Sequence, residues 1–110
     1  MTAELTVELT EQGYLHVPAS TAERYFPQDL FVPLWRPPEL WLVPVYGAGG
    51  GGLLLKRRNL QGDRSALIWE ALPPEVRPGK YPALWSAEQG MLRVLLPNLA
   101  EEGRSEQASI

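Results

Sequence analysis

The sequence predicts a mainly β protein, a small barrel or sandwich of roughly seven or eight short strands with one short helix near residues 21–26. Three observations carry this prediction. Apolar and polar residues alternate with a period of two along most of the chain, helical periodicity is nearly absent, and the 11 prolines and 10 glycines fall mostly between the alternating segments. Proline and glycine in such places are typical of turns between strands.

The chain is expected to begin with two strands. Residues 5–10 alternate apolar and polar side chains, and the pair 12–13, Gln-Gly, turns the chain into a second strand over residues 14–17. Pro18 ends that strand because proline has no N–H to give to a ladder.

One short helix is expected next. Ser20 and Glu23 have the spacing of a capping box, in which each side chain bonds to the other residue's amide. The helix should therefore run from about residue 21 to residue 26 and stop at Pro27.

The remaining segments predict strands separated by turns. Residues 40–46 are apolar on both faces, which favours a central position in a sheet or barrel. Residues 53–59 and 65–72 are expected to form a hairpin across residues 60–63. Residues 1–97 should form a single domain, and residues 98–110, which lack apolar periodicity, a disordered tail. The other predicted strands are residues 30–35, 81–85 and 91–96.

The composition excludes much chemistry. The 110 residues include no cysteine and one histidine, His16, whereas a metal site or a hydrolytic triad needs several partners. The glycine run 47–52 is followed by leucines, not by the Gly-Lys-Ser/Thr and helix of a phosphate-binding loop. We therefore expect no catalytic residues, no metal and no cofactor, and a protein that is not an enzyme.

The N-terminal residues suggest a cytoplasmic protein. Residues 1–11 alternate in polarity and carry three glutamates, unlike a secretory signal. The apolar and glycine stretch 43–55 is interrupted by Pro44 and falls short of the roughly 18 residues of a membrane helix, so no membrane partner is expected.

Charge is distributed unevenly along a chain whose net charge is −3. Residues 1–55 carry six acidic and two basic side chains, and residues 56–80 carry six basic and three acidic ones. Four of these cations, Lys56, Arg57, Arg58 and Arg64, should lie near the tip of the predicted hairpin. They could bind phosphates or carboxylates, or simply blunt a strand end.

The four tryptophans lie on four different predicted strands, and at least two should pack in the core. Trp35, beside Arg36 and two prolines, is the candidate for an exposed partner contact.

The run Gly-Tyr-Leu-His-Val-Pro-Ala at residues 13–19, with Glu23 and Arg24 after it and Glu-Leu-Trp-Leu at residues 39–42, resembles the swapped-hairpin barrels of AbrB and MraZ type transcription regulators. The resemblance implies a dimer that binds DNA through basic barrel residues. Residues 51–72 more faintly resemble small accessory proteins encoded beside bacterial nickel-iron hydrogenases.

These observations favour a non-catalytic β-barrel interaction module, an accessory or assembly factor that binds another protein with an acidic surface. Docking between copies, as in a homodimer, also fits opposite charges on separate segments. The alternative is a DNA-binding regulator that contacts phosphates, and the third hypothesis is a barrel that binds a small ligand. The candidate contact residues are Lys56, Arg57, Arg58, Arg64, Trp35 and Arg36.

Overall fold

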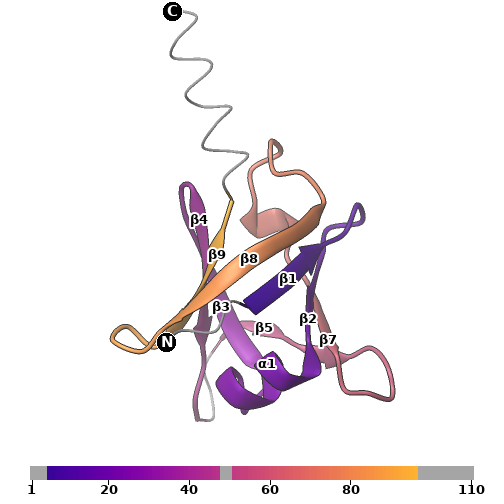
Figure 1. Ribbon diagram of the computed structural model, residues 1–110, viewed down its shortest axis with the longest axis vertical. Coiled ribbons are helices and arrows are strands. Elements are labelled where there is room, and N and C mark those ends of the chain that lie inside the picture. Colours follow the sequence, from indigo (N-terminus) through magenta and orange to yellow (C-terminus); the bar gives the residue numbers. More distant parts are fainter. Residues whose placement is uncertain (1–4, 48–50, 97–110) are drawn as a thin grey trace, which may run out of the picture.

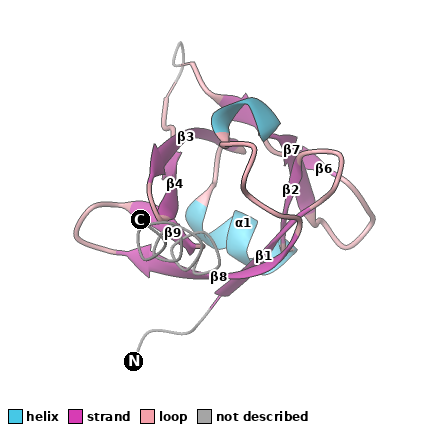
Figure 2. Ribbon diagram, turned by 90° about the horizontal axis from the view of Figure 1, so that it is seen from above, coloured by secondary structure: helices cyan, strands magenta, loops and turns pink. Residues whose placement is uncertain are grey.

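The computed structural model describes residues 5–47 and 51–96, and it confirms the mainly β class. All strands belong to one antiparallel sheet, which curls into a nearly closed barrel with α1 over one end (Figures 1 and 2). The elements are β1 (Leu5–Leu9), β2 (Tyr14–Val17), α1 (Ala19–Tyr25), β3 (Leu30–Arg36), β4 (Glu39–Pro44), β5 (Leu53–Leu54), β6 (Lys56–Arg57), β7 (Arg64–Leu67), the 3-10 helix η1 (Trp69–Ala71), β8 (Gly79–Ser86) and β9 (Met91–Leu95). The strand order is β5-β3-β4-β9-β8-β1-β2-β7-β6.

The two ends of this strand order belong to one short segment. β5 pairs with β3, β6 pairs with β7, and only Leu55 separates β5 from β6. Leu55 is buried, and its N–H donates to the carbonyl of Asp29 at 2.7 Å. The segment therefore brings the two ends of the sheet together, and it divides the predicted strand 53–59 in two, so the described sheet has nine strands and not seven or eight.

The barrel interior is filled by side chains from alternate strand positions. Phe26, which follows α1, meets Phe31 edge to face with ring centroids 6.1 Å apart. The strand β4 lies between β3 and β9, which confirms its predicted central position. Residues with less than 2 % exposure include Leu15, Val17, Phe26, Phe31, Leu40, Leu42, Ile68, Leu92 and Val94.

The helix α1 begins earlier than predicted, and its N-terminus is capped by a distant residue. The capping box was wrong: Pro18 is the N-cap residue, no side chain of the helix caps it, and Ser20 lies inside the first turn. Instead the N–H of Ala19 donates to Oδ1 of Asp63 at 2.8 Å. Two hydrogen bonds lower the pKa of the Asp63 carboxyl from its usual value. The larger effect comes from the side-chain amide of Asn59 and the smaller one from the N–H of Ala19.

The predicted hairpin is present but shorter than expected. β6 and β7 pair at Lys56 with Ser65 and at Arg57 with Arg64, while Leu53 and Leu54 pair with β3 instead. β7 ends at Leu67, so the predicted strand 65–72 was wrong beyond that point. Ala66 and Ile68 point into the barrel, so a longer strand would place Glu70 inside it as well. Burying an unpaired carboxylate costs too much free energy, so the strand ends first.

Two sequence predictions concern residues that lie outside the described part of the chain. The predicted tail 98–110 lies wholly outside it, and the glycine run 47–52 is described only at Gly47, Gly51 and Gly52. Gly52 has φ +116, and a Cβ there would lie 2.8 Å from the carbonyl oxygen of Phe31.

A forked ion pair ties β4 to β9 on the outer face of the barrel. Both carboxylate oxygens of Glu39 accept from the guanidinium of Arg93, at 2.8 and 2.6 Å, and Nε1 of Trp41 also donates to Glu39 at 2.8 Å. The bonds from Arg93, more than any other cause, lower the pKa of the Glu39 carboxyl from its usual 4.5.

We expect the Glu39 fork to contribute to the acid sensitivity of the fold. Because the folded-state pKa is lowered, the stabilisation is complete above the unfolded value of 4.5 and is lost as pH falls through the folded value. Glu39→Gln should lower the free energy of unfolding by about 1 kcal/mol at neutral pH and flatten its decline below about pH 5. Urea unfolding at a series of pH values measures this. Glu88→Gln, in an exposed turn, is the control, and an equal effect of both variants would contradict the assignment.

Candidate protein-binding face

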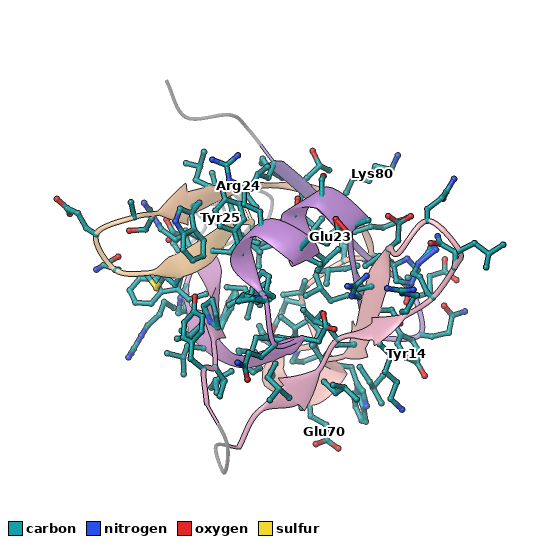
Figure 3. The ribbon with its side chains drawn as sticks, turned by 90° about the horizontal axis from the view of Figure 1, so that it is seen from below. Tyr14, Glu23, Arg24, Tyr25, Glu70 and Lys80 are labelled. Atoms are coloured by element: carbon teal, nitrogen blue, oxygen red, sulfur yellow. The ribbon has the colours of Figure 1, made fainter. Side chains whose placement is uncertain are left out.

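Exposed apolar side chains gather where β7 meets η1. Trp69 is 58 % exposed and Leu67 is 47 % exposed, although both are large and apolar. Leu67 pairs across the sheet with Tyr14 of β2, which is also exposed. We call Tyr14, Leu67 and Trp69 the Trp69 face. Figure 3 shows Tyr14 and Glu70, the neighbour of Trp69, at the lower right of the view, and Lys80 at the upper right.

Trp69 is held in place by the backbone of Gly13. A Cβ built on Gly13 would lie 2.4 Å from Cβ of Trp69, and Gly13 has φ +89, a conformation that other residues rarely adopt. The N–H of Ile68 also donates to the Gly13 carbonyl at 3.0 Å. The close approach fixes the Trp69 backbone, while its ring is left largely in solvent.

Trp69 stands between two surface hollows. One, of about 640 Å³, is lined by β3 residues Val32 and Pro33, by Gly52 and Leu53, and by residues 67–71. The other, of about 650 Å³, is lined by residues of the β1–β2 turn and by the proline-rich connection 72–78. A large, exposed aromatic side chain on a fixed backbone, beside apolar hollows, has the properties of an interface anchor.

The predicted cations Lys56, Arg57 and Arg58 are all exposed, as expected for a binding role or for a solvated strand end. Lys56 pairs with Ser65, and Leu67 lies two residues after Ser65, so these positions share the outer face of the sheet. The structure therefore places Lys56 on the same outer face as Leu67, whereas Arg57 pairs with the inward Arg64 and Arg58 lines a different hollow, that of His16.

Arg64, the fourth predicted cation, is not at the hairpin tip. It is only 7 % exposed, and its Nε donates to Oδ1 of Asp29 at 2.9 Å while Nη1 donates to the carbonyl of Gly62. The reason lies in the alternation: Ala66, two residues later, is buried in the same strand, so Arg64 points inward as well. Arg64 cross-links the hairpin to the turn after α1.

Trp35 was predicted to be exposed, and this was wrong. It pairs with the buried Leu40 across β3 and β4, so it faces inward, where it packs half-buried against the core. Arg36 is exposed, with its guanidinium carbon 5.6 Å from the ring centroid of Trp41. Neither residue is part of the Trp69 face.

The sequence contained a signal for Trp69 that the strand prediction obscured. Extended pairing through residue 72 would place Leu67, Trp69 and Ala71 on the outer face and Glu70 inside the barrel. An outward run of apolar residues and an inward carboxylate together indicate both the end of the strand and an exposed apolar surface.

His16 lies in a separate, smaller hollow of about 270 Å³, lined also by Glu8, Arg58, Asp63 and Lys80. Its Nδ1 is buried without a hydrogen-bond partner and lies 3.8 Å from Oε1 of Glu8. The cations of this hollow are offset by two carboxylates, so it has little net charge with which to attract an anion. Among the described residues, no group of three His, Cys, Asp or Glu side chains could hold a metal ion.

Comparisons with known protein families, with curated proteins and with solved structures found no match. The resemblances to AbrB and MraZ type regulators and to hydrogenase accessory proteins therefore stay predictions. No helix in the described part of the chain is long and apolar enough to cross a membrane.

Proposed function

We propose that this protein is a non-catalytic binding module that docks another protein through the Trp69 face, as an accessory or assembly factor would. The observation that carries the proposal is the exposure of Trp69, held against Gly13 between two hollows. An exposed cluster of large apolar side chains, here Tyr14, Leu67 and Trp69, is typical of surfaces that bind other proteins.

The charges of β6 and the residue after it point to the chemistry of the partner. Lys56, Arg57 and Arg58 are exposed, whereas Arg64 turns inward to Asp29, and Lys56 shares the outer face with Leu67. Guanidinium groups bind carboxylates with two hydrogen bonds, and complementary charge orients an encounter and speeds it. The partner is therefore expected to present an apolar residue to the Trp69 face and acidic residues to the three cations.

Affinity capture from an extract of the source organism tests this function with two pairs of variants, one pair for the Trp69 ring and one for the cations. Each pair contains a control substitution. Trp69→Ala removes the ring but keeps the Cβ that touches Gly13, and it should reduce recovery of the partner at least tenfold, since a buried Trp anchor is worth about 2 kcal/mol or more. Leu60→Ala changes a fully exposed apolar residue that lines none of the three hollows described above, and it should leave recovery unchanged.

The second pair of variants tests the cations by comparing Arg57→Glu with the control Arg24→Glu. Arg24 lies on α1. Only the first reversal should weaken capture, and capture by the wild-type protein should fall as salt is raised. Recovery that is insensitive to Trp69→Ala would refute the function proposed for this face.

DNA binding is the second candidate function, favoured by the run of exposed cations at Lys56, Arg57 and Arg58. Each phosphate contact would contribute a slope of about 0.9 to the fall of log affinity with log salt on duplex DNA. A gel shift on random duplex at low salt measures this. Binding that survives replacement of all three cations by alanine, or no binding at all, would remove DNA as the partner.

A further inference from the structure

The sheet is open on one side of the barrel, where two strand edges lack a hydrogen-bonded partner strand in the described part of the chain. β3 pairs with β5 only at Leu30 and Phe31, so no described strand pairs with Val32–Arg36 on that side. β7 pairs with β6 at Arg64 and Ser65, and the register does not continue to Leu67. We call this gap the seam. It contains the hollow of about 640 Å³, and η1 lies between β3 and β7 in Figure 2.

The backbone of β3 presents hydrogen-bonding groups to the seam. The Asp29 carbonyl accepts from Leu55 on the β5 side, and the Leu30 carbonyl accepts from Val45 on the β4 side. Successive residues of a strand alternate between its two sides, so the backbone groups of Pro33 and Trp35 point into the seam. Proline has no N–H, so this edge offers two carbonyl acceptors and one N–H donor.

We propose that the partner binds the seam as an extended segment that adds a strand to the open edge of β3. This inference rests on the proposed function and specifies how the partner is held. The added strand would receive main-chain hydrogen bonds from Trp35 and give them to Pro33 and Trp35, as in other cases of strand addition. Its alternate side chains would point toward the hollow beside Trp69.

Charge indicates the composition of the bound segment. Lys56 follows Leu55 at the closed end of the seam, against one carboxylate, Glu70, in the described lining of the hollow. The occupant is therefore an extended segment with apolar residues at alternate positions and acidic residues at the end that lies near Lys56.

The probe for this test is a displayed library of random dodecapeptides, selected on the wild-type protein. Peptides that lose binding to Trp69→Ala but not to Leu60→Ala are synthesised, and each backbone N–H is methylated in turn. Methylation should weaken binding about tenfold at the two N–H groups that meet the Pro33 and Trp35 carbonyls, and less than about twofold at the residue between them. The selected sequences should be acidic, with apolar residues at alternate positions.

A second variant tests the same edge from the protein side. Pro33→Ala adds an N–H that faces the seam, and the selected peptides should bind it about threefold more tightly once urea unfolding shows the variant to be folded. Unchanged affinity would contradict strand addition.

The outcomes separate this inference from the proposed function. Peptides that need Trp69 but show no period-two response to methylation would overturn strand addition and leave the Trp69 face as the binding surface. Selection that yields no Trp69-dependent peptide would overturn both. A wild-type protein that sediments as a dimer at the selection concentration, and becomes monomeric in Trp69→Ala, would show that a second copy occupies the seam and would also contradict the inference.

Discussion

Replacing Gly13 with alanine is expected to lower the free energy of unfolding by about 2–4 kcal/mol. Two costs add. The backbone at φ +89 strains any residue that has a Cβ, and the new methyl group would lie 2.4 Å from Cβ of Trp69, so the backbone of β2 or of η1 must move. The displaced Trp69 should also lose its place on the Trp69 face.

Gly47→Ala is a matched control for the Gly13 substitution. Gly47 has a similar φ of +86, but a Cβ there would meet nothing within 4 Å, so the variant reports the backbone cost alone. Urea unfolding of both variants gives the contact cost by difference. Equal destabilisation by the two would show that Gly13 does not hold Trp69.

Arg64→Leu is expected to lower the free energy of unfolding by about 2–4 kcal/mol. The substitution removes the guanidinium that joins β7 to Asp29 and to the Gly62 carbonyl. The side chain of Asp29 is 38 % exposed, so water can hydrate part of its carboxylate when the ion pair with Arg64 is lost. The turn after α1 should loosen as well as the hairpin.

Arg57→Leu is the control for Arg64→Leu, because the two residues pair across β6 and β7 but Arg57 is exposed. Its effect on unfolding should stay within about 0.5 kcal/mol. Hydrogen exchange should show faster opening of the Asp29 amide, which donates to the Phe26 carbonyl in the turn after α1, in Arg64→Leu alone. Equal effects of the two variants on stability would contradict a structural role for Arg64.

Alternation in the sequence was sufficient to predict the β class, because most inward positions of a barrel strand are apolar whichever strands are its neighbours. The predicted strands at residues 5–10 and 14–17 therefore correspond to β1 and β2, although β1 ends one residue earlier, at Leu9. The division at Leu55 could not be predicted in the same way. It depends on two different partners, β3 and β7, which are far from each other in sequence, and alternation does not identify partners.

The candidate site was predicted only in part, for a related reason. Lys56, Arg57 and Arg58 were identified by charge alone, and their exposure needs no tertiary contact. The role of Arg64 depends on Asp29, which lies 35 positions earlier in the sequence. The role of Trp69 depends in the same way on a distant residue, Gly13. An inward arginine and an outward tryptophan oppose average preferences, and long-range contacts override those averages.

The capping of α1 shows the same limit on a smaller scale. Ser20 and Glu23 satisfied the local pattern, but Pro18 already provides the N-cap, and Asp63 of the hairpin loop accepts the Ala19 N–H. A local motif predicts that a helix starts nearby, whereas the fold decides which side chain satisfies its free amides.

Photo-cross-linking from position 67 tests most directly whether the Trp69 face binds a partner protein, because it leaves the Trp69 ring in place. A photoreactive phenylalanine analogue replaces the exposed Leu67 in one variant and the exposed Leu60 in another, and both are irradiated in extract of the source organism. We expect one cross-linked protein from position 67, identified by mass spectrometry, absent from position 60 and lost when Lys56, Arg57 and Arg58 are changed to glutamate. The same products from both positions, or none from position 67, would contradict the proposed function.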